Sequence, residues 1–97
     1  MQILRSDEFD EWLRKLRDDR ARSRIQARVL RLSMGNAGDA NPVGEGISEM
    51  RIDYGPGYRV YFIRRGEELM VLLCGGDKST QERDIILSKA IAKRWKE

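Results

Sequence analysis

The chain has 97 residues, 40% hydrophobic and 36% charged, and this composition predicts one ordered globular domain. No apolar run approaches the ~20 residues of a membrane-spanning helix, so a cytoplasmic protein without membrane contact is expected. The lack of histidine and the single cysteine, Cys74, exclude zinc sites built from both residue types, histidine-containing triads and an internal disulfide. Net charge is only +3, yet 14 of the 19 basic residues are arginine, which suits either a polyanionic partner or a solvated surface of mixed sign.

The N-terminal part of the chain predicts a short strand followed by an amphipathic helix. Residues 2–4 fit an edge strand, and Ser6 is suited to cap a helix that runs to about Arg17. Apolar side chains then recur at the spacing of one helical face, at Phe9, Trp12, Leu13 and Leu16. This stripe is expected to face a core.

A second helix is predicted next, capped by Asp18 or Asp19 and ending at Gly35, a residue suited to the left-handed position after a helix. Its apolar residues are Ala21, Ile25, Val29 and Leu32, and we expect the two helices to form a hairpin. Four arginines share another face, at Arg20, Arg24, Arg28 and Arg31. This basic ridge is either an ordinary solvated helix face or a partner surface, and Arg24 and Arg28 are its candidate RNA phosphate ligands.

Residues 34–46 hold four glycines and one proline and are expected to form a long surface loop. Three strands follow, at residues 47–53, 58–65 and 69–74, joined by turns at 54–57 and 64–68. The third strand is apolar on both faces and is therefore expected to be central. The segments predict an antiparallel meander of three strands, widened to four if residues 2–4 join it.

Alternation along the first hairpin of this meander predicts two faces of different character. Four apolar residues share the core face, at Met50, Ile52, Val60 and Phe62. The other face then brings Arg51 and Arg59 together, with Glu49 and Tyr61 beside them, in a register that requires an odd-length loop or a bulge. Two guanidinium groups on neighbouring strands make a candidate phosphate clamp. The alternative is pairing of these arginines with Glu49 or Asp53 on a solvent face.

The segment 75–80 joins the last strand to a final helix. Its glycines suit a turn, and Ser79 or Thr80 suits a helix cap, so free backbone N–H groups and Lys78 are expected to face any bound anion. A P-loop is excluded because Asp77 separates the glycines from Lys78. A plain strand-to-helix turn remains the alternative. The helix is expected to bury a line of apolar residues, at Leu87, Ile91 and Trp95, with Ile86 and Ala90 beside it.

Taken together, three segments of the chain, 47–51, 55–62 and 72–81, resemble the RelE/HigB-like toxins of type II toxin–antitoxin modules. The branch that the chain resembles is the one called addiction module killer protein, and the likeness covers essentially the whole sequence. The resemblance implies an α+β, RelE-like fold in which two N-terminal helices pack on a mostly antiparallel three- to four-stranded sheet, with a C-terminal helix added.

The resemblance also implies an activity, namely cleavage of messenger RNA in the ribosomal A site without a metal or another cofactor. Carried onto this chain, Arg51, Arg59 and Lys78 are the basic site residues, and Asp84 lies near the place of a tyrosine that RelE has early in its last helix. The ribose 2′-OH would attack the adjacent phosphate, and Glu49, Asp77 or Asp84 would accept its proton.

The partner implied by the resemblance is a helix-turn-helix antitoxin encoded next to the toxin, with operator DNA bound only through that antitoxin. Two other readings remain open. One is a ParE-like toxin that inhibits DNA gyrase without catalysis, and the other is a degenerate toxin that only binds its antitoxin.

Overall fold

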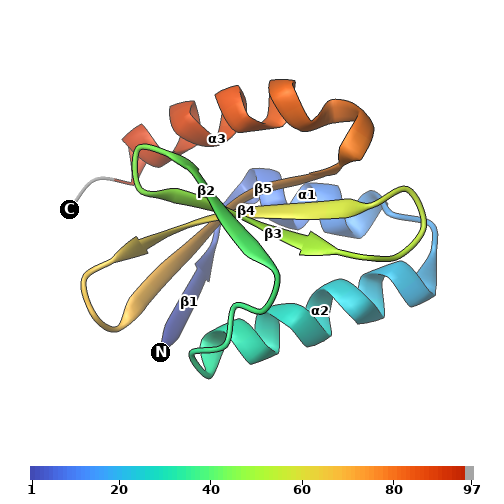
Figure 1. The fold of residues 1–97 in the computed structure, drawn as a ribbon, viewed down its shortest axis with the longest axis horizontal. Coiled ribbons are helices and arrows are strands. Elements are labelled where there is room, and N and C mark those ends of the chain that lie inside the picture. The colour runs from blue at the N-terminus through green and yellow to red at the C-terminus, as the bar shows by residue number, and fades with distance from the viewer. Residues whose placement is uncertain (96–97) are drawn as a thin grey trace.

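The computed structural model describes residues 1–95 and has an α+β fold with one mixed sheet (Figure 1). In chain order the elements are β1 (Gln2–Arg5), α1 (Asp7–Lys15), α2 (Asp19–Ser33), β2 (Ala40–Gly44), β3 (Ile47–Ile52), β4 (Tyr58–Arg65), β5 (Leu69–Asp77), a 3₁₀ turn (Lys78–Thr80) and α3 (Gln81–Arg94). The five strands are ordered β1-β5-β4-β3-β2, with β1 parallel to β5 and every other pair antiparallel. Within residues 1–95, no helix is long and apolar enough to cross a membrane.

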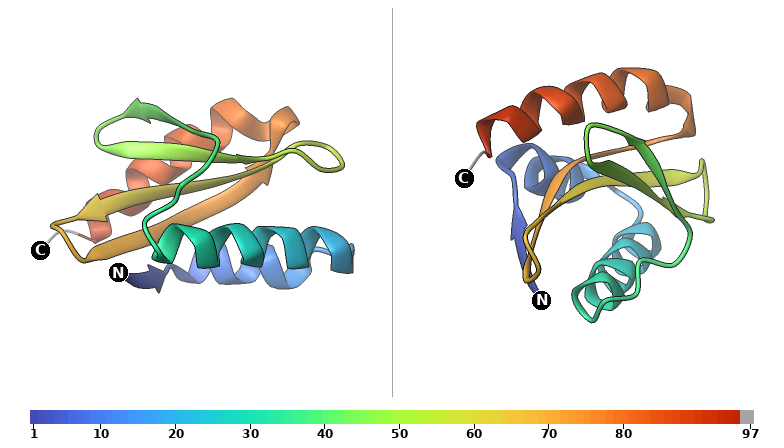
Figure 2. Two further views of the ribbon diagram at one scale, coloured as in Figure 1. Left: turned by 60° about the horizontal axis from the view of Figure 1, so that its bottom comes forward. Right: turned by 60° about the vertical axis from the view of Figure 1, so that its left-hand side comes forward.

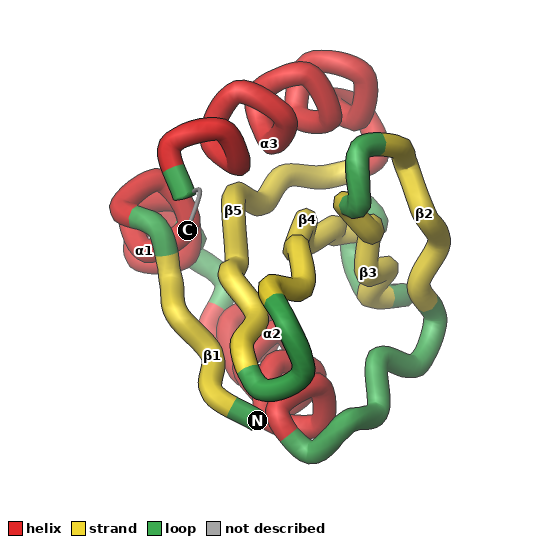
Figure 3. Tube along the Cα trace, turned by 90° about the vertical axis from the view of Figure 1, so that its left-hand side faces the viewer, coloured by secondary structure: helices red, strands yellow, loops and turns green. Residues whose placement is uncertain are grey.

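Helices cover both faces of the sheet, so the molecule has three layers (Figures 2 and 3). On one face, Phe9 and Leu13 of α1 and Ile25 of α2 pack against Val60 and Met50 of the sheet. On the other face a second cluster joins α3 to the sheet, with members Ile47, Tyr61, Ile63, Val71, Leu73, Cys74, Ile91 and Ala92. The fold therefore has two core clusters, one on each side of the sheet.

The helix ends follow the local signals in the sequence. Ser6 Oγ accepts a 3.0 Å hydrogen bond from the Phe9 amide, and the Asp18 carboxylate accepts bonds from the first turn of α2. Gly35 follows the end of α2 with φ +90°, where its amide donates to the carbonyl oxygen of Leu32. Helix α1 ends at Lys15, earlier than expected, because Leu16 is already extended.

The sheet is wider than the sequence predicts, with five strands instead of three or four. Residues 34–46 are not one loop, because Ala40–Gly44 pairs with β3 as an edge strand. Pro42 is tolerated there since an edge strand can lack one ladder donor. The N-terminal strand joins in parallel, next to β5. Strand β5 therefore lies between β1 and β4, which agrees with the interior position predicted from its two apolar faces. These partners are distant in sequence, and strand pattern alone does not specify them.

The last helix is rotated relative to the predicted apolar line. Its buried residues are Asp84, Ser88, Ile91 and Ala92, whereas Ile86 is 70% and Leu87 41% exposed. The glycine pair is not a turn either, because β5 continues through Gly75 and Gly76 to Asp77. A Cβ atom added at Gly76 would lie 1.8 Å from Asp84 Oδ2, so this glycine lets α3 pack closely on β5.

Candidate phosphate-binding site

The β3–β4 hairpin places two arginines opposite each other. Arg51 pairs with Arg59, and the next pair, Ile52 with Tyr58, leaves residues 53–57 as the connection. Five residues are an odd number, so the predicted register is confirmed. The two guanidinium groups therefore start from adjacent positions at the same end of the sheet.

A pocket of about 270 Å³ lies at this end of the hairpin. Its lining residues are Asp39, Arg51, Ile52, Asp53, Gly57, Tyr58, Arg59 and Lys78. Arg51 comes from the end of β3, Arg59 from the start of β4, and Lys78 from the 3₁₀ turn after β5. The structure thus brings together three of the candidate site residues, from three elements. Burial raises the pKa of the Tyr58 phenol, the aromatic side chain of the pocket.

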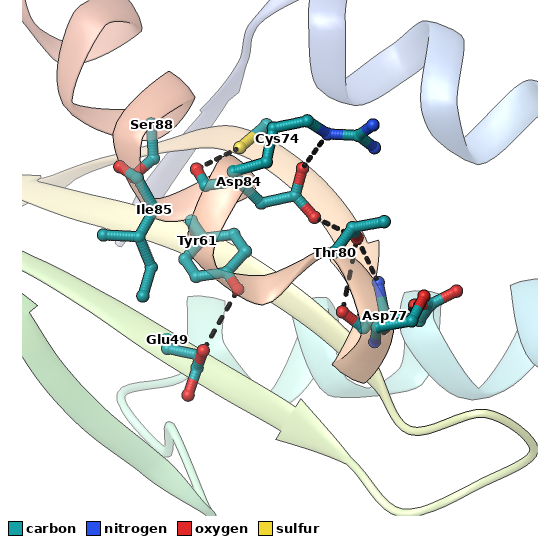
Figure 4. Close-up of polar contacts among 10 residues, drawn as sticks. Glu49, Tyr61, Cys74, Asp77, Thr80, Asp84, Ile85 and Ser88 are labelled. Atoms are coloured by element: carbon teal, nitrogen blue, oxygen red, sulfur yellow. Dashed lines mark hydrogen bonds and ion pairs between the residues drawn. The ribbon is translucent and has the colours of Figure 1, made fainter.

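Arg59 is held by a buried polar cluster on the α3 side of the sheet. Its Nη1 lies 2.8 Å from Glu49 Oε1, and Glu49 Oε2 accepts a 2.8 Å bond from Gln81 Nε2. Glu49 Oε2 also accepts a 3.0 Å bond from Tyr61 Oη (Figure 4). Glu49 is only 2% exposed. The pairing of Arg59 with Glu49 therefore exists, but in a buried site rather than on a solvent face. Burial, together with the Glu49 carboxylate, raises the pKa of Tyr61, so its hydroxyl stays a donor.

Glu49 is consequently an anchor for Arg59, and not a group that lines the pocket. Both of its carboxylate oxygens are already occupied, which leaves little capacity to accept a substrate proton. Gln81, at the start of α3, was not recognised from the sequence as part of this cluster. Only the packing of α3 brings its amide to Glu49, across 32 positions of the chain.

Arg51 has a different partner, at the edge of the sheet. Its Nη2 lies 3.2 Å from Asp39 Oδ1, and its backbone amide donates a 2.8 Å hydrogen bond to the carbonyl oxygen of Asp39. The Arg51 side chain remains 40% exposed. Asp39 is a pocket residue that sequence reasoning missed; the signal available was its position at the end of a glycine-rich segment that precedes β2.

The arginines of the basic ridge on α2 make different contacts. Arg28 donates from Nη1 to the carbonyl oxygen of Arg51 at 2.6 Å and from Nη2 to that of Ala37 at 3.0 Å. Arg24 lies over the ring of Tyr54, 4.7 Å from its centroid, in a cation–π contact. Neither guanidinium lines the pocket. The candidate phosphate role of Arg24 and Arg28 thus finds no support in their placement.

The two remaining carboxylates considered as proton acceptors form hydrogen bonds with residues of the 3₁₀ turn before α3. Asp77 Oδ1 accepts a 2.8 Å hydrogen bond from the Ser79 amide and so caps the 3₁₀ turn. Thr80 takes the N-cap position of α3, as predicted, although its side chain makes no capping hydrogen bond there. Asp84 is 3% exposed and accepts a 2.5 Å bond from Thr80 Oγ1 (Figure 4). Asp84 does not line the pocket. Asp84 therefore holds the start of α3 against β5.

The electrostatics of the pocket suit an anion. The Nε atoms of Arg51 and Arg59 are buried without a hydrogen-bond partner in the described part of the chain, and Lys78 forms no ion pair within it. Unpaired buried donors are uncommon in folded proteins. Residues 1–95 contain no group of three acidic or cysteine side chains placed to hold a metal ion. The arrangement can bind a phosphate through guanidinium and ammonium donors.

A comparison with known proteins identifies one relative across nearly the full length. A protein of Haemophilus influenzae strain Rd, described only as an uncharacterized protein, is 51% identical over 92 residues, which span 95% of this chain and 93% of the relative. No model of a known protein family matches the chain.

Proposed function

The chain belongs to the same family as this Haemophilus influenzae protein, and we propose that it is a RelE/HigB-like toxin of a type II toxin–antitoxin module that cleaves messenger RNA in the cytoplasm. The observation that carries the proposal is the convergence of Arg51, Arg59 and Lys78 on one pocket. The resemblance of the three motif segments supports it, as does the α+β arrangement with helices on both sides of an antiparallel hairpin. We extend the proposal to a RelE-like fold.

The pocket supports a reaction in which charge stabilisation is the main contribution of the protein. Attack of a ribose 2′-OH on the adjacent phosphate gives a transition state with extra negative charge, a 2′,3′-cyclic phosphate and a free 5′-OH. Arg51, Arg59 and Lys78 are placed to donate to the phosphate oxygens, and one well-placed donor of this kind contributes about 3 kcal/mol to the barrier reduction. Binding in the ribosomal A site would supply the orientation of the RNA.

The proposed function includes a protein partner. A helix-turn-helix antitoxin encoded next to the toxin would neutralise it by covering the basic pocket, and operator DNA would be bound only through that antitoxin. Reading the neighbouring gene and testing co-purification of its product with this chain checks this part of the proposal. A neighbouring product that neither binds the chain nor relieves its toxicity would contradict it.

Expression from a tightly regulated promoter, followed by mapping of messenger RNA 5′ ends in translating cells, tests the activity. We expect new ends with a 5′-OH within minutes of induction, and strongly reduced cleavage with Arg51→Ala or Lys78→Ala. Arg31→Ala is the matched control, because Arg31 is exposed on α2 and does not line the pocket. Intact transcripts during growth arrest would falsify the nuclease assignment.

One observation favours a second candidate function, a ParE-like toxin that inhibits DNA gyrase without catalysis. Glu49 and Asp84, two of the three carboxylates considered as bases, are buried outside the pocket. A binding toxin needs no proton acceptor. Induction of DNA damage signalling with stable transcripts would support this candidate, and absence of any growth defect with folded protein would support a degenerate toxin that only binds its antitoxin.

A further inference from the structure

The proposed cleavage needs a group that accepts the proton of the attacking 2′-OH, and the structure eliminates the acidic residues that the sequence offers first. Both oxygens of Glu49 are engaged within the buried cluster. Asp77 caps the 3₁₀ turn, and Asp84 is bound to Thr80 outside the pocket. Two carboxylates line the pocket, Asp39 and Asp53. The choice therefore lies between these two.

Asp39 is held in place against Arg51 by two separate contacts. Its backbone carbonyl accepts the Arg51 amide at 2.8 Å, and its Oδ1 lies 3.2 Å from Arg51 Nη2. The side chain is nevertheless 62% exposed, so a ligand in the pocket has access to it. Asp53 lies in the turn after β3, and no side-chain hydrogen bond orients it among the residues that the structure describes. Of the two carboxylates, Asp39 alone has a defined position beside a phosphate-binding group.

The segment that carries Asp39 is itself fixed to the sheet. Arg28 bridges the carbonyl oxygens of Ala37 and Arg51, and thereby joins the start of the segment to β3. Gly38 has φ +65°, and a Cβ atom there would lie 2.9 Å from Arg28 Nη2. The left-handed backbone favours glycine at this position, and a side chain there would also displace the Arg28 guanidinium. Arg28 and Gly38 position Asp39 without touching a ligand in the pocket.

We propose that Asp39 is the general base of the cleavage, an assignment that rests on the proposed nuclease function. The substrate phosphate takes the place of the carboxylate at Arg51 Nη2, which frees Asp39 Oδ1. Asp39 then accepts the 2′-OH proton while O2′ forms a bond to phosphorus. The bond from phosphorus to O5′ breaks, O5′ keeps the electron pair, and it takes a proton from the Lys78 ammonium group. Proton exchange with water restores both side chains.

The experiment compares full-length wild type, Asp39→Asn and Asp39→Glu in a cell-free translation reaction, with reporter cleavage read by primer extension over a range of pH. Glu67→Gln is the control with the same change of charge, since Glu67 is exposed in the β4–β5 turn and lies outside the pocket. Binding is measured separately, by fluorescence anisotropy with a 2′-deoxy oligonucleotide that cannot react. Circular dichroism and thermal melting verify that each variant is folded.

We expect Asp39→Asn to cleave about 100-fold more slowly while binding the 2′-deoxy oligonucleotide as tightly as wild type or more tightly, because Arg51 loses its competing carboxylate. Asp39→Glu should regain part of the rate, and the acidic limb of the pH–rate profile should disappear in Asp39→Asn. Cleavage within threefold of wild type, or equal losses of binding and cleavage, would overturn the assignment and leave the nuclease function standing. Intact reporter RNA with wild type would overturn both.

Discussion

Arg28 donates hydrogen bonds to two backbone carbonyl oxygens, those of Arg51 at 2.6 Å and Ala37 at 3.0 Å, and so links α2 to both sides of the β2–β3 edge. Sequence spacing had grouped this arginine with exposed neighbours on a basic ridge. In the structure, the hydrogen bonds of Arg28 hold the segment that carries Asp39 against β3.

Replacing Arg28 by alanine should lower the free energy of unfolding by about 2 kcal/mol, because two carbonyl acceptors lose a charged donor at a partly buried place. Arg28→Lys should restore little, since an ammonium group lacks the planar fork that spans both acceptors. Urea unfolding measures the change. Arg31→Ala, on the exposed face of the same helix, should stay within about 0.5 kcal/mol of wild type. Equal losses of unfolding free energy in the two alanine variants would show that the hydrogen bonds of Arg28 do not stabilise the fold.

Glu49→Gln should be among the most destabilising conservative substitutions in the chain. It leaves the Arg59 guanidinium charged and unpaired at a place where both side chains are almost fully buried, 11% and 3% exposed. Removing one partner of a buried ion pair costs about 3–5 kcal/mol. Equilibrium unfolding in urea is the measurement, with Glu67→Gln as the exposed control of equal charge change. A loss below about 1 kcal/mol would mean that the cluster contributes little.

Gly76→Ala should destabilise the protein by about 1–3 kcal/mol through overpacking, because the new methyl group would meet the Asp84 carboxylate. The specific prediction is one of coupling. In the double variant Gly76→Ala/Asp84→Ala the nearest colliding group is gone, and only Thr80 Oγ1 remains, 2.8 Å from the new Cβ. The loss of unfolding free energy in the double variant should therefore be smaller than the sum of the two single losses. A thermodynamic cycle by urea unfolding tests this, and strict additivity would show that the contact does not limit the packing of α3.

Cys74 should be unreactive in the folded protein and should make stability fall in alkaline solution. Burial raises the pKa of its thiol to about 12, against about 8.5 in an unfolded chain. Because the pKa is higher in the folded chain, the contribution of the buried thiol to the free energy of unfolding is complete below pH ~8.5. It is lost progressively as the pH rises toward 12, since the unfolded chain gives up the thiol proton first. The stability difference between wild type and Cys74→Ala should therefore narrow from pH 8 to pH 10.5. A constant difference, or rapid labelling by a thiol reagent at pH 8 without denaturant, would contradict the burial.

The sequence by itself determined the features that depend on neighbours a few residues apart. Ser6 and Asp18 cap helices because a side-chain oxygen two or three residues upstream satisfies amides that have no partner in the first turn. Alternation along two strands predicted that Arg51 faces Arg59 if an odd-length loop or a bulge joined them. The structure supplied the five-residue connection, because β3 ends at Ile52. Lys78 was predicted to face a bound anion because it lies between the last strand and the final helix, and it lines the pocket.

Only the tertiary structure decided which partners those groups take. The parallel pairing of β1, the edge strand β2 and the rotation of α3 depend on contacts between segments far apart in the chain, which no local period encodes. The carboxylates of the site were assigned by the same long-range packing. Glu49 is buried under α3 and pairs with Arg59, whereas the hydrogen bonds of Arg28 hold Asp39 beside Arg51. A charged group in a folded chain pairs with the partner that packing places beside it.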